Sequence, residues 1–245
     1  MLSVIIITKN EAHSIDDCLK SVAWADEIIV VDSGSTDETI KLCEKHGAKV
    51  LKNDWPGFGK QKNYALSQAK GTWVLSIDAD ERVTLKLKDA INQAIKHPEI
   101  VGWEMPRMSS LCGKYIKHCG WWPDHVTRLF KNGHAKFSDD IVHEKLIVNG
   151  PIGTLKIPLM HESIESLDEL LSKMNEYTSA GALMLHKQNK STSLTKAILK
   201  GLWAFFRCYI LRAGFLDGRE GFILSISMAE SSYYRQIKLL MLNKK

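Results

Sequence analysis

The first hundred residues alternate between short apolar runs and segments with apolar residues at helical spacing. The runs are rich in β-branched residues and predict strands at residues 3–7, 27–32, 49–51 and 73–78. Helical spacing predicts one helix from Ser14, a second from Ser35 with Glu38 completing a capping box, and a third across residues 61–69. Continuous apolar strands separated by helices indicate a parallel sheet buried on both faces, as in nucleotide-binding domains.

The pattern changes near residue 101. Short strand candidates broken by glycine, proline and asparagine follow at residues 103–105, 126–130, 145–148 and 154–158. Helical periodicity then returns at residues 167–186, 194–216 and 222–242, with a turn predicted at 217–221. The expected fold class is therefore α/β with a mixed central sheet: a domain of residues 1–163, with halves 1–100 and 101–163, followed by a helical region of residues 164–245.

Composition describes a globular chain. Of 245 residues, 44% are hydrophobic and 25% charged, with 16 glycines and 6 prolines, which excludes collagen-like, mucin-like and wholly disordered proteins. Five cysteines form no even framework and no C-x-x-C pair, which favours a reducing compartment. The amino end has no basic region or cleavage site, and no run of 18 uncharged apolar residues occurs, so we expect neither a signal peptide nor a membrane-spanning helix.

The net charge of +5 is unevenly distributed. Residues 187–245 carry 11 basic and 3 acidic residues, whereas residues 1–186 carry 22 basic and 25 acidic ones. Basic residues interleaved with aromatic ones are typical of helices that lie on an anionic membrane surface; packing on the rest of the chain or on a second subunit is the alternative. The charge gives no reason to expect nucleic acid as a partner, and the sequence leaves the oligomeric state unknown.

Polar loops follow three predicted strands at their carboxyl ends, where open α/β sheets form ligand crevices. Their candidate residues are Thr8, Asn10 and Glu11 after the first strand, Asp32 and Ser33 after the second, and Asp78 and Asp80 after the fourth. Alternating carboxylates can hold Mg²⁺ or Mn²⁺ against a diphosphate, although helix capping is an alternative role for them.

A glycine- and lysine-containing segment, residues 55–63, lies between the second and fourth strands. Lys60, Lys62 and Asn63, with the amino end of the following helix, could cradle a diphosphate; a plain turn into a helix is the alternative.

The ordered set TKNE, DSGSTD, GFGKQKN and DADE resembles the family-2 glycosyltransferases of the GT-A fold. The resemblance implies that residues 1–100 bind a nucleotide-sugar donor and residues 101–163 the acceptor. It further implies that residues 8–11 and Asp32 contact the nucleotide, and that Asp78 and Asp80 handle the ribose and a diphosphate bound to Mg²⁺ or Mn²⁺.

Downstream motifs, GWWPD, RLFK, VHE and His161, resemble the bacterial lipopolysaccharide-core β-1,4-glucosyltransferases. That resemblance implies transfer of a hexose, expected to be glucose from UDP-glucose, to the inner-core heptose of a lipid-linked saccharide. Together with the basic, apolar tail, a lipid-borne acceptor predicts a cytoplasmic, peripheral enzyme on the inner face of the bacterial inner membrane. The expected acceptor or sugar contacts are Trp121, Trp122, Asp124, Arg128 and His143.

Inverting transfer needs a carboxylate that takes the acceptor's proton. Glu144 is the candidate base, with Asp139 and Asp140 as rivals, although Glu144 could instead pair with Arg128. His161 follows a strand and could reach the metal beside Asp80, and a purely structural histidine is the alternative.

Two other functions fit parts of the sequence. A nucleotidyltransferase would also place metal-binding acids at strand ends, but it usually has a glycine-rich basic loop where TKNE stands. A membrane-attached carbohydrate-binding protein without catalysis would explain the tryptophans and the basic tail, but it would leave the acidic strand ends without a role.

Overall fold

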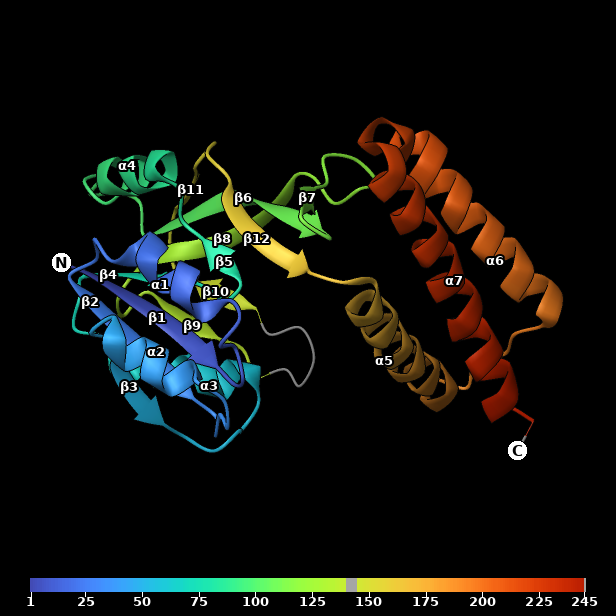
Figure 1. Ribbon diagram of the computed structural model, residues 1–245, viewed down its shortest axis with the longest axis horizontal. Helices are drawn as coiled ribbons and strands as arrows, with labels where there is room; N and C mark the ends of the chain where they lie inside the picture. The colour runs from blue at the N-terminus through green and yellow to red at the C-terminus, as the bar shows by residue number, and fades with distance from the viewer. Residues whose placement is uncertain (140–144, 245) are drawn as a thin grey trace. The chain divides into compact units, whose positions relative to one another are not determined.

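The computed structural model describes residues 1–139 and 145–244 and divides into two compact units (Figure 1). Unit 1 comprises Met1–Arg107 and Asp124–His161, and unit 2 comprises Met108–Pro123 and Glu162–Lys245. Residues 108–123, which the sequence pattern placed with the α/β domain, therefore belong with the C-terminal helices.

The main sheet is mixed. Its strands run in the order β3 (Lys49–Lys52), β2 (Glu27–Asp32), β1 (Leu2–Thr8), β4 (Trp73–Ser76), β8 (Asp124–Lys131), β6 (Gly102–Leu111), β12 (Leu159–Ile164) and β5 (Glu81–Arg82). The first four are parallel, and β8 joins β4 in the antiparallel sense. Strands β7 (Lys114–Tyr115) and β11 (Ile152–Thr154) pair with β6, while β9 (Ala135–Phe137) and β10 (Leu146–Val148) form a separate pair.

Helices cover both faces of the parallel strands. They are α1 (Ile15–Val22), α2 (Thr39–Lys45), α3 (Phe58–Ser67) and α4 (Leu85–Ala94). Alternate residues of β1 point to opposite faces. Val4 belongs to the cluster that contains Leu19 of α1 and Leu87 of α4, whereas Ile5 belongs to the cluster that contains Ala65 of α3. The α/β class and the mixed sheet predicted from the sequence are confirmed.

Three predicted element boundaries in unit 1 are wrong. The helix expected from Ser35 begins at Thr39, because the Ser35 hydroxyl oxygen, which would accept a helix N–H in a cap, instead accepts the Asn10 N–H at 2.8 Å. The third helix begins at Phe58 rather than at residue 61. Residues 155–158 form no strand; β11 ends before them and β12 begins after them, and Pro158 has no N–H with which to continue a ladder.

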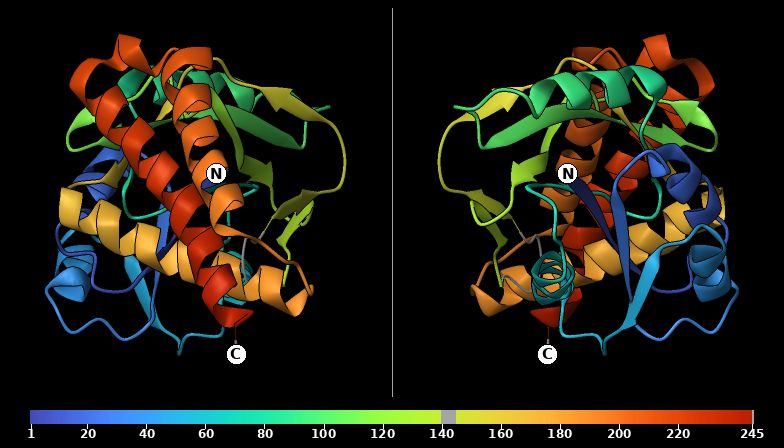
Figure 2. Two further views of the ribbon diagram at one scale, coloured as in Figure 1. Left: turned by 90° about the vertical axis from the view of Figure 1, so that its right-hand side faces the viewer. Right: turned by 90° about the vertical axis from the view of Figure 1, so that its left-hand side faces the viewer.

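Unit 2 is built on helices. They are α5 (Leu167–Lys187), α6 (Leu194–Phe206), a π-helical turn (Arg207–Leu211), a 3₁₀ turn (Gly214–Asp217) and α7 (Gly218–Leu242). Helices α6 and α7 lie side by side in both views of Figure 2. The core of this unit contains Leu111, Ile116, Cys119, Ile164, Leu170, Cys208 and Leu224. In the described part of the chain, no helix is both long and apolar enough to cross a membrane.

The turn predicted at residues 217–221 lies earlier in the chain. The helical path breaks at Ala213, which has a left-handed φ of 52°, and α7 already begins at Gly218. Asp217 is buried, and its carboxylate accepts hydrogen bonds from the backbone N–H groups of Lys117 and His118. Asp217 therefore fixes the start of α7 instead of forming an exposed turn.

Candidate functional site

The polar loops predicted to share a crevice leave the same edge of the sheet. Strand β1 is parallel to both β2 and β4, with Thr8 opposite Asp32 and Ile5 opposite Ser76. The carboxyl ends of these three strands therefore lie next to one another, with the TKNE, DSGSTD and DADE loops directly after them.

Asp32 organises the first two loops. It is fully buried, and its carboxylate accepts hydrogen bonds from the Gly34 N–H (2.9 Å), the Ser35 N–H (2.8 Å), the Thr8 hydroxyl (3.2 Å) and the Ser35 hydroxyl. Asn10 closes the same arrangement, because its side-chain oxygen accepts from the Thr36 N–H at 2.8 Å. In this structure the acceptor capacity of Asp32 serves the loop, and its predicted contact with a nucleotide stays a prediction.

Ser33 is held by a residue of helix α3. Its hydroxyl accepts a 2.8 Å hydrogen bond from the side-chain amide of Gln61, which is itself fully buried on α3. The amide oxygen of Gln61 in turn accepts from Asn53 at 2.7 Å. Ser33 is thus part of a packed polar contact between the loop after β2 and helix α3.

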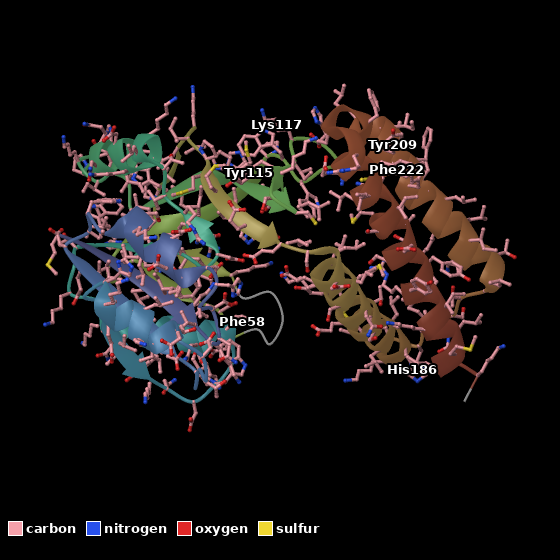
Figure 3. The ribbon with its side chains drawn as sticks, in the orientation of Figure 1. Phe58, Tyr115, Lys117, His186, Tyr209 and Phe222 are labelled. Atoms are coloured by element: carbon pink, nitrogen blue, oxygen red, sulfur yellow. The ribbon has the colours of Figure 1, made fainter. Side chains whose placement is uncertain are left out.

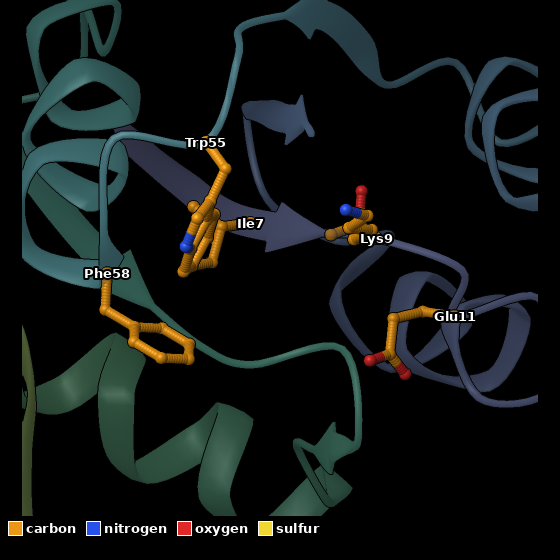
Figure 4. Close-up of a pocket in the computed structure, with 6 residues that line it drawn as sticks. Ile7, Lys9, Glu11, Trp55 and Phe58 are labelled. Atoms are coloured by element: carbon orange, nitrogen blue, oxygen red, sulfur yellow. The ribbon is translucent and has the colours of Figure 1, made fainter. Parts of the chain in front are cut away.

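A pocket of about 300 Å³ opens beside the end of β1 (Figure 4). Its lining residues are Ile7, Thr8, Lys9, Glu11, Trp55 and Phe58. The rings of Trp55 and Phe58 meet edge to face with centroids 4.7 Å apart, and each side chain is roughly half exposed. Thr8 and Glu11 were predicted from the sequence, whereas the aromatic pair was missed. The available signal was two aromatic residues around Pro56-Gly57 in a polar segment.

Helix α3 contains most of the GFGKQKN segment. Lys60, Lys62 and Asn63 lie in its first two turns, and their predicted contact with a diphosphate stays a prediction. Asn63 donates to the carbonyl of Phe137 and accepts from its N–H, both at 2.9 Å, so its amide anchors β9 to α3. Lys60 is exposed, whereas Lys62 is buried.

Asp78 is held between two cations. The Lys62 ammonium lies 3.0 Å from one carboxylate oxygen, and the Arg128 guanidinium donates to the other. Burial by itself would raise the pKa of Asp78, but Arg128 and Lys62 outweigh it and hold that pKa well below its usual range. Asp78 is therefore an ionised, internally neutralised carboxylate.

Glu81 completes this network from a fully buried position. One of its oxygens accepts from Arg128 at 2.6 Å, and the other accepts from the Asp78 N–H at 3.0 Å. Burial raises the pKa of Glu81, with Arg128 opposing that effect and the charge of Asp78 adding to it. Arg82 supports the turn by donating to the carbonyl of Ala79 at 2.8 Å. The acidic turn is thus held rigidly from inside unit 1.

Asp80 differs from Asp78 in its partner, because Asp80 pairs with His161 whereas Asp78, equally exposed, pairs with Lys62 and Arg128. His161 lies opposite Glu81 in the β5–β12 pairing, and its Nε2 approaches an Asp80 oxygen at 3.1 Å. The Asp80 side chain is 30% exposed and that of His161 is 13% exposed. The structure therefore brings together the two residues that the sequence suggested as metal ligands.

The donor set fits a cation shared with a ligand rather than one enclosed by protein. Among the described residues, no group of three or more histidine, cysteine, aspartate and glutamate side chains could hold a metal ion. Asp80 and His161 offer one oxygen donor and one nitrogen donor, and Mg²⁺ usually keeps waters and substrate phosphates as its remaining ligands. A diphosphate-bound Mg²⁺ or Mn²⁺ is compatible with this pair.

The predicted acceptor residues lie in different places. Arg128 belongs to the Asp78 network, and Asp124 accepts from Arg107 at 2.7 and 3.0 Å. Trp121 and Trp122 belong to unit 2, where Trp121 packs partly buried against the hydrophobic core. Asp139 is exposed in unit 1, and the other predicted residues, Asp140, His143 and Glu144, lie outside the described residues.

The chain is similar to proteins of one enzyme family. The model of Glycosyl transferase family 2 matches residues 3–140. An uncharacterized glycosyltransferase of Rickettsia bellii is 33% identical, covering 97% of this chain and 85% of that protein. The lipopolysaccharide core biosynthesis glycosyltransferase LpsC of Rhizobium meliloti is 29% identical, covering 97% and 91%.

Among solved structures, the chain is similar to TarS residues 1–349 of S. aureus, with a TM-score of 0.48 and 17% identity over 99% of this chain and 91% of that one. The family match spans both the loops at the sheet edge and the acidic turn that Arg128 holds. The chain belongs to glycosyl transferase family 2, and it is a glycosyltransferase.

Proposed function

We propose that the protein transfers a hexose, with glucose from UDP-glucose as the preferred donor, to the inner-core heptose of lipopolysaccharide or a related lipid-linked saccharide. The observation that carries the proposal is the partly exposed Asp80–His161 pair at the sheet edge where the TKNE and DSGSTD loops also begin. The relative named for lipopolysaccharide core biosynthesis supports the choice of acceptor. A lipid-linked acceptor would place the enzyme on the inner face of the bacterial inner membrane.

The pocket beside β1 suits the nucleotide end of the donor. Trp55 and Phe58 offer aromatic surface on which a uracil base can stack, while Thr8 and Glu11 offer polar groups. Such pockets typically combine apolar walls with a few polar groups that set orientation. Of the two lysines on α3, Lys60 is the one that we assign to the diphosphate, because it is exposed whereas Lys62 is engaged with Asp78.

Asp80 and His161 are the residues that would hold Mg²⁺ or Mn²⁺. When bound, the cation would supply electrostatic stabilisation to the leaving diphosphate. Asp78 and Glu81 would act indirectly, because their network with Arg128 fixes the backbone of the turn that carries Asp80. Asp80 would therefore contact the cation, and Asp78 would position the turn that carries Asp80.

Inversion at the anomeric carbon requires attack by an acceptor hydroxyl from the side opposite the nucleotide. We assign Glu144 as the general base that takes the hydroxyl proton, with Asp139 and Asp140 as the alternatives. The acceptor oxygen forms the new glycosidic bond, and UDP leaves with the electron pair of the broken bond.

A transfer assay tests the proposal. The protein is incubated with a panel of radiolabelled UDP-sugars and a heptose-terminated lipopolysaccharide core, and label in the core is counted. We expect label from UDP-glucose, and we expect Glu144→Gln to bind the donor but to lose roughly 10²-fold or more of the transfer rate.

Two outcomes would overturn parts of this account. No label from any UDP-sugar, with release of pyrophosphate from a nucleoside triphosphate instead, would indicate nucleotidyl transfer. Full turnover by Glu144→Gln would move the base to Asp139 or Asp140, which the corresponding asparagine variants would then identify.

A further inference from the structure

Helix α6 of unit 2 packs through its small side chains. Ala197, Gly201 and Cys208 are buried, and they recur at intervals of four and seven residues, which places them on one face of the helical path. A Cβ added to Gly201 would lie 3.3 Å from both the Ala229 carbonyl oxygen and the Tyr233 Cβ of α7. Helix α6 therefore approaches α7 closely along this face.

The large apolar side chains of α6 face the other way. Leu199, Leu202, Trp203 and Phe206 follow one another at intervals of three, one and three residues, on the face opposite Ala197 and Gly201. They are 60%, 64%, 57% and 44% exposed, respectively. We call these four residues the α6 stripe. Helix α6 thus exposes large apolar side chains, whereas an ordinary surface helix buries its large apolar residues and exposes its polar ones.

An aromatic cluster fixes this orientation. Tyr209, in the π-helical turn, meets Phe222 of α7 edge to face at 5.5 Å, and these two side chains lie together in Figure 3. Phe205 stacks on Tyr209 at 5.4 Å and also meets Phe222 at 5.9 Å. Because the carboxyl end of α6 is tied to α7 in this way, the helix cannot simply turn to bury its stripe.

Positive charge flanks the α6 stripe. Lys196, Lys200 and Arg207 are exposed along one side of it, and no aspartate or glutamate occurs from residue 177 to residue 216. Partial burial, with the charges of Lys196 and Arg235, lowers the pKa of Lys200, so these cations lie close enough to repel one another. A partner that covers the α6 stripe must therefore be apolar where it meets the four side chains and negatively charged where it meets the flanking cations.

We infer that the α6 stripe with its flanking Lys196, Lys200 and Arg207 docks on a bilayer that contains anionic phospholipid. Leu, Trp and Phe side chains enter the boundary between headgroups and acyl chains, while the basic residues meet the lipid phosphates. A second copy of the chain is a poorer occupant, because a symmetric contact would bring the same cations face to face. The inference deepens the proposed function by specifying how the enzyme reaches a lipid-linked acceptor.

The test is flotation of the full chain with two kinds of vesicle, phosphatidylcholine alone and an equimolar mixture with phosphatidylglycerol. We expect recovery with the mixed vesicles and little with phosphatidylcholine alone. Leu202→Glu should lower partitioning roughly tenfold or more, because it places a charge in the apolar boundary. Lys196→Gln with Lys200→Gln should reduce it roughly tenfold by removing two cations.

Leu85→Glu is the matched control, since Leu85 is a 79% exposed leucine on α4 of unit 1. It should float like the wild type. UDP binding by the wild type tests the proposed donor site. UDP binding by each variant, compared with the wild type, reports on whether that variant folds. Vesicle binding without any UDP binding would retain the docking surface and reject the proposed donor. Equal flotation of Leu202→Glu and wild type would overturn the inference. It would also be overturned if the wild type does not float and instead forms a dimer that Leu202→Glu dissociates, because a second copy would then cover the α6 stripe.

Discussion

The structure gives Trp55 and Phe58 a role that differs from the one the sequence suggested for their segment. In the sequence they flank a glycine in a segment that suggested a backbone cradle for phosphate, yet in the structure they line a pocket. Exposed aromatic side chains that pack edge to face at 4.7 Å form a preorganised surface for a planar ligand.

Replacing Trp55 should therefore weaken nucleotide binding. Stacking of a base on an aromatic side chain is worth about 1–3 kcal/mol by alanine substitution, so we expect Trp55→Ala to reduce UDP affinity by that amount and Trp55→Phe to retain most of it. Calorimetric titration with UDP measures both. Trp203→Ala, which removes a similarly exposed tryptophan from α6, should bind UDP like the wild type; equal affinity of Trp55→Ala and wild type would remove the base from this pocket.

Arg128 should matter for stability as well as for the site. Removing its guanidinium would take the 2.6 Å partner from the fully buried carboxylate of Glu81 and one of the two cations from Asp78. We expect Arg128→Met to lower the free energy of unfolding by about 3–5 kcal/mol, measured by chemical denaturation. Arg219→Met, at an 84% exposed position, should cost less than about 1 kcal/mol. If Arg128→Met also lowered the free energy of unfolding by less than about 1 kcal/mol, the network would not be what holds the acidic turn.

The residues of this network show what a sequence pattern can reveal at the smallest scale. Asp78 and Asp80 were predicted because they follow an apolar strand directly, and that relation is local. The partners of Asp78 were not predicted, since Lys62 lies on α3 and Arg128 lies on β8, which is adjacent to β4 only in the folded sheet. Acidic residues could thus be located from the sequence, but whether each faces a ligand or an internal cation could not.

At the scale of elements, β1, β2, β4 and helix α1 follow from apolar periodicity, because each has many buried positions that specify one structure. Boundaries that depend on one polar side chain were less predictable. Ser35 fits a capping box, but its hydroxyl oxygen accepts the Asn10 N–H and its proton goes to Asp32, so it caps no helix and the helix starts four residues later.

Helices α1 and α2 are joined by an ion pair that should make stability depend on pH. Asp16 of α1 contacts Lys20 at 2.5 Å and His46, at the carboxyl end of α2, at 2.8 Å. Hydrogen bonds from Lys20 and then His46 lower the pKa of Asp16 from 3.8 to about 2. The folded state thus binds fewer protons than the unfolded state between these values, so the stabilisation is present above about pH 4 and is lost as the pH falls toward 2.

Asp16→Asn should therefore lose less stability than the wild type when the pH is lowered through this range, as measured by thermal melts. Asp17→Asn is the control, because Asp17 is the next residue on α1 and pairs with Lys20 alone among the described ion pairs. It should keep the pH dependence of the wild type. Identical profiles for Asp16→Asn and wild type would show that the ion pairs of Asp16 with Lys20 and His46 do not contribute.

At the scale of the whole molecule, the sequence predicted an α/β part followed by helices, and it missed that residues 108–123 belong to the helical unit. That segment carries strand-like and loop-like residues, and its membership depends on long-range contacts. The Asp217 carboxylate accepts from the Lys117 and His118 N–H groups, and Cys119 and Cys208 join one core, at separations of about a hundred residues. No local pattern reveals such contacts, so Trp121 and Trp122 could be assigned a role in sugar binding but not a place in the fold.

The family model matches residues 3–140, most of which lie in unit 1, and the donor site proposed above belongs to that unit. The central claim is that Asp80, with His161, holds a divalent cation against the diphosphate of a UDP-sugar, while Asp78 is committed to Lys62 and Arg128. The claim concerns binding, so it can be tested without knowing the acceptor.

Titration of UDP in the presence and absence of Mn²⁺ is the most direct measurement. For the wild type and for Asp89→Asn, which changes an exposed carboxylate on α4, we expect Mn²⁺ to strengthen UDP binding roughly tenfold or more, which is ~1.4 kcal/mol or more. For Asp80→Asn it predicts UDP binding that no longer responds to Mn²⁺. Wild-type affinity that is equal with and without the metal, or a full Mn²⁺ response in Asp80→Asn, would contradict it.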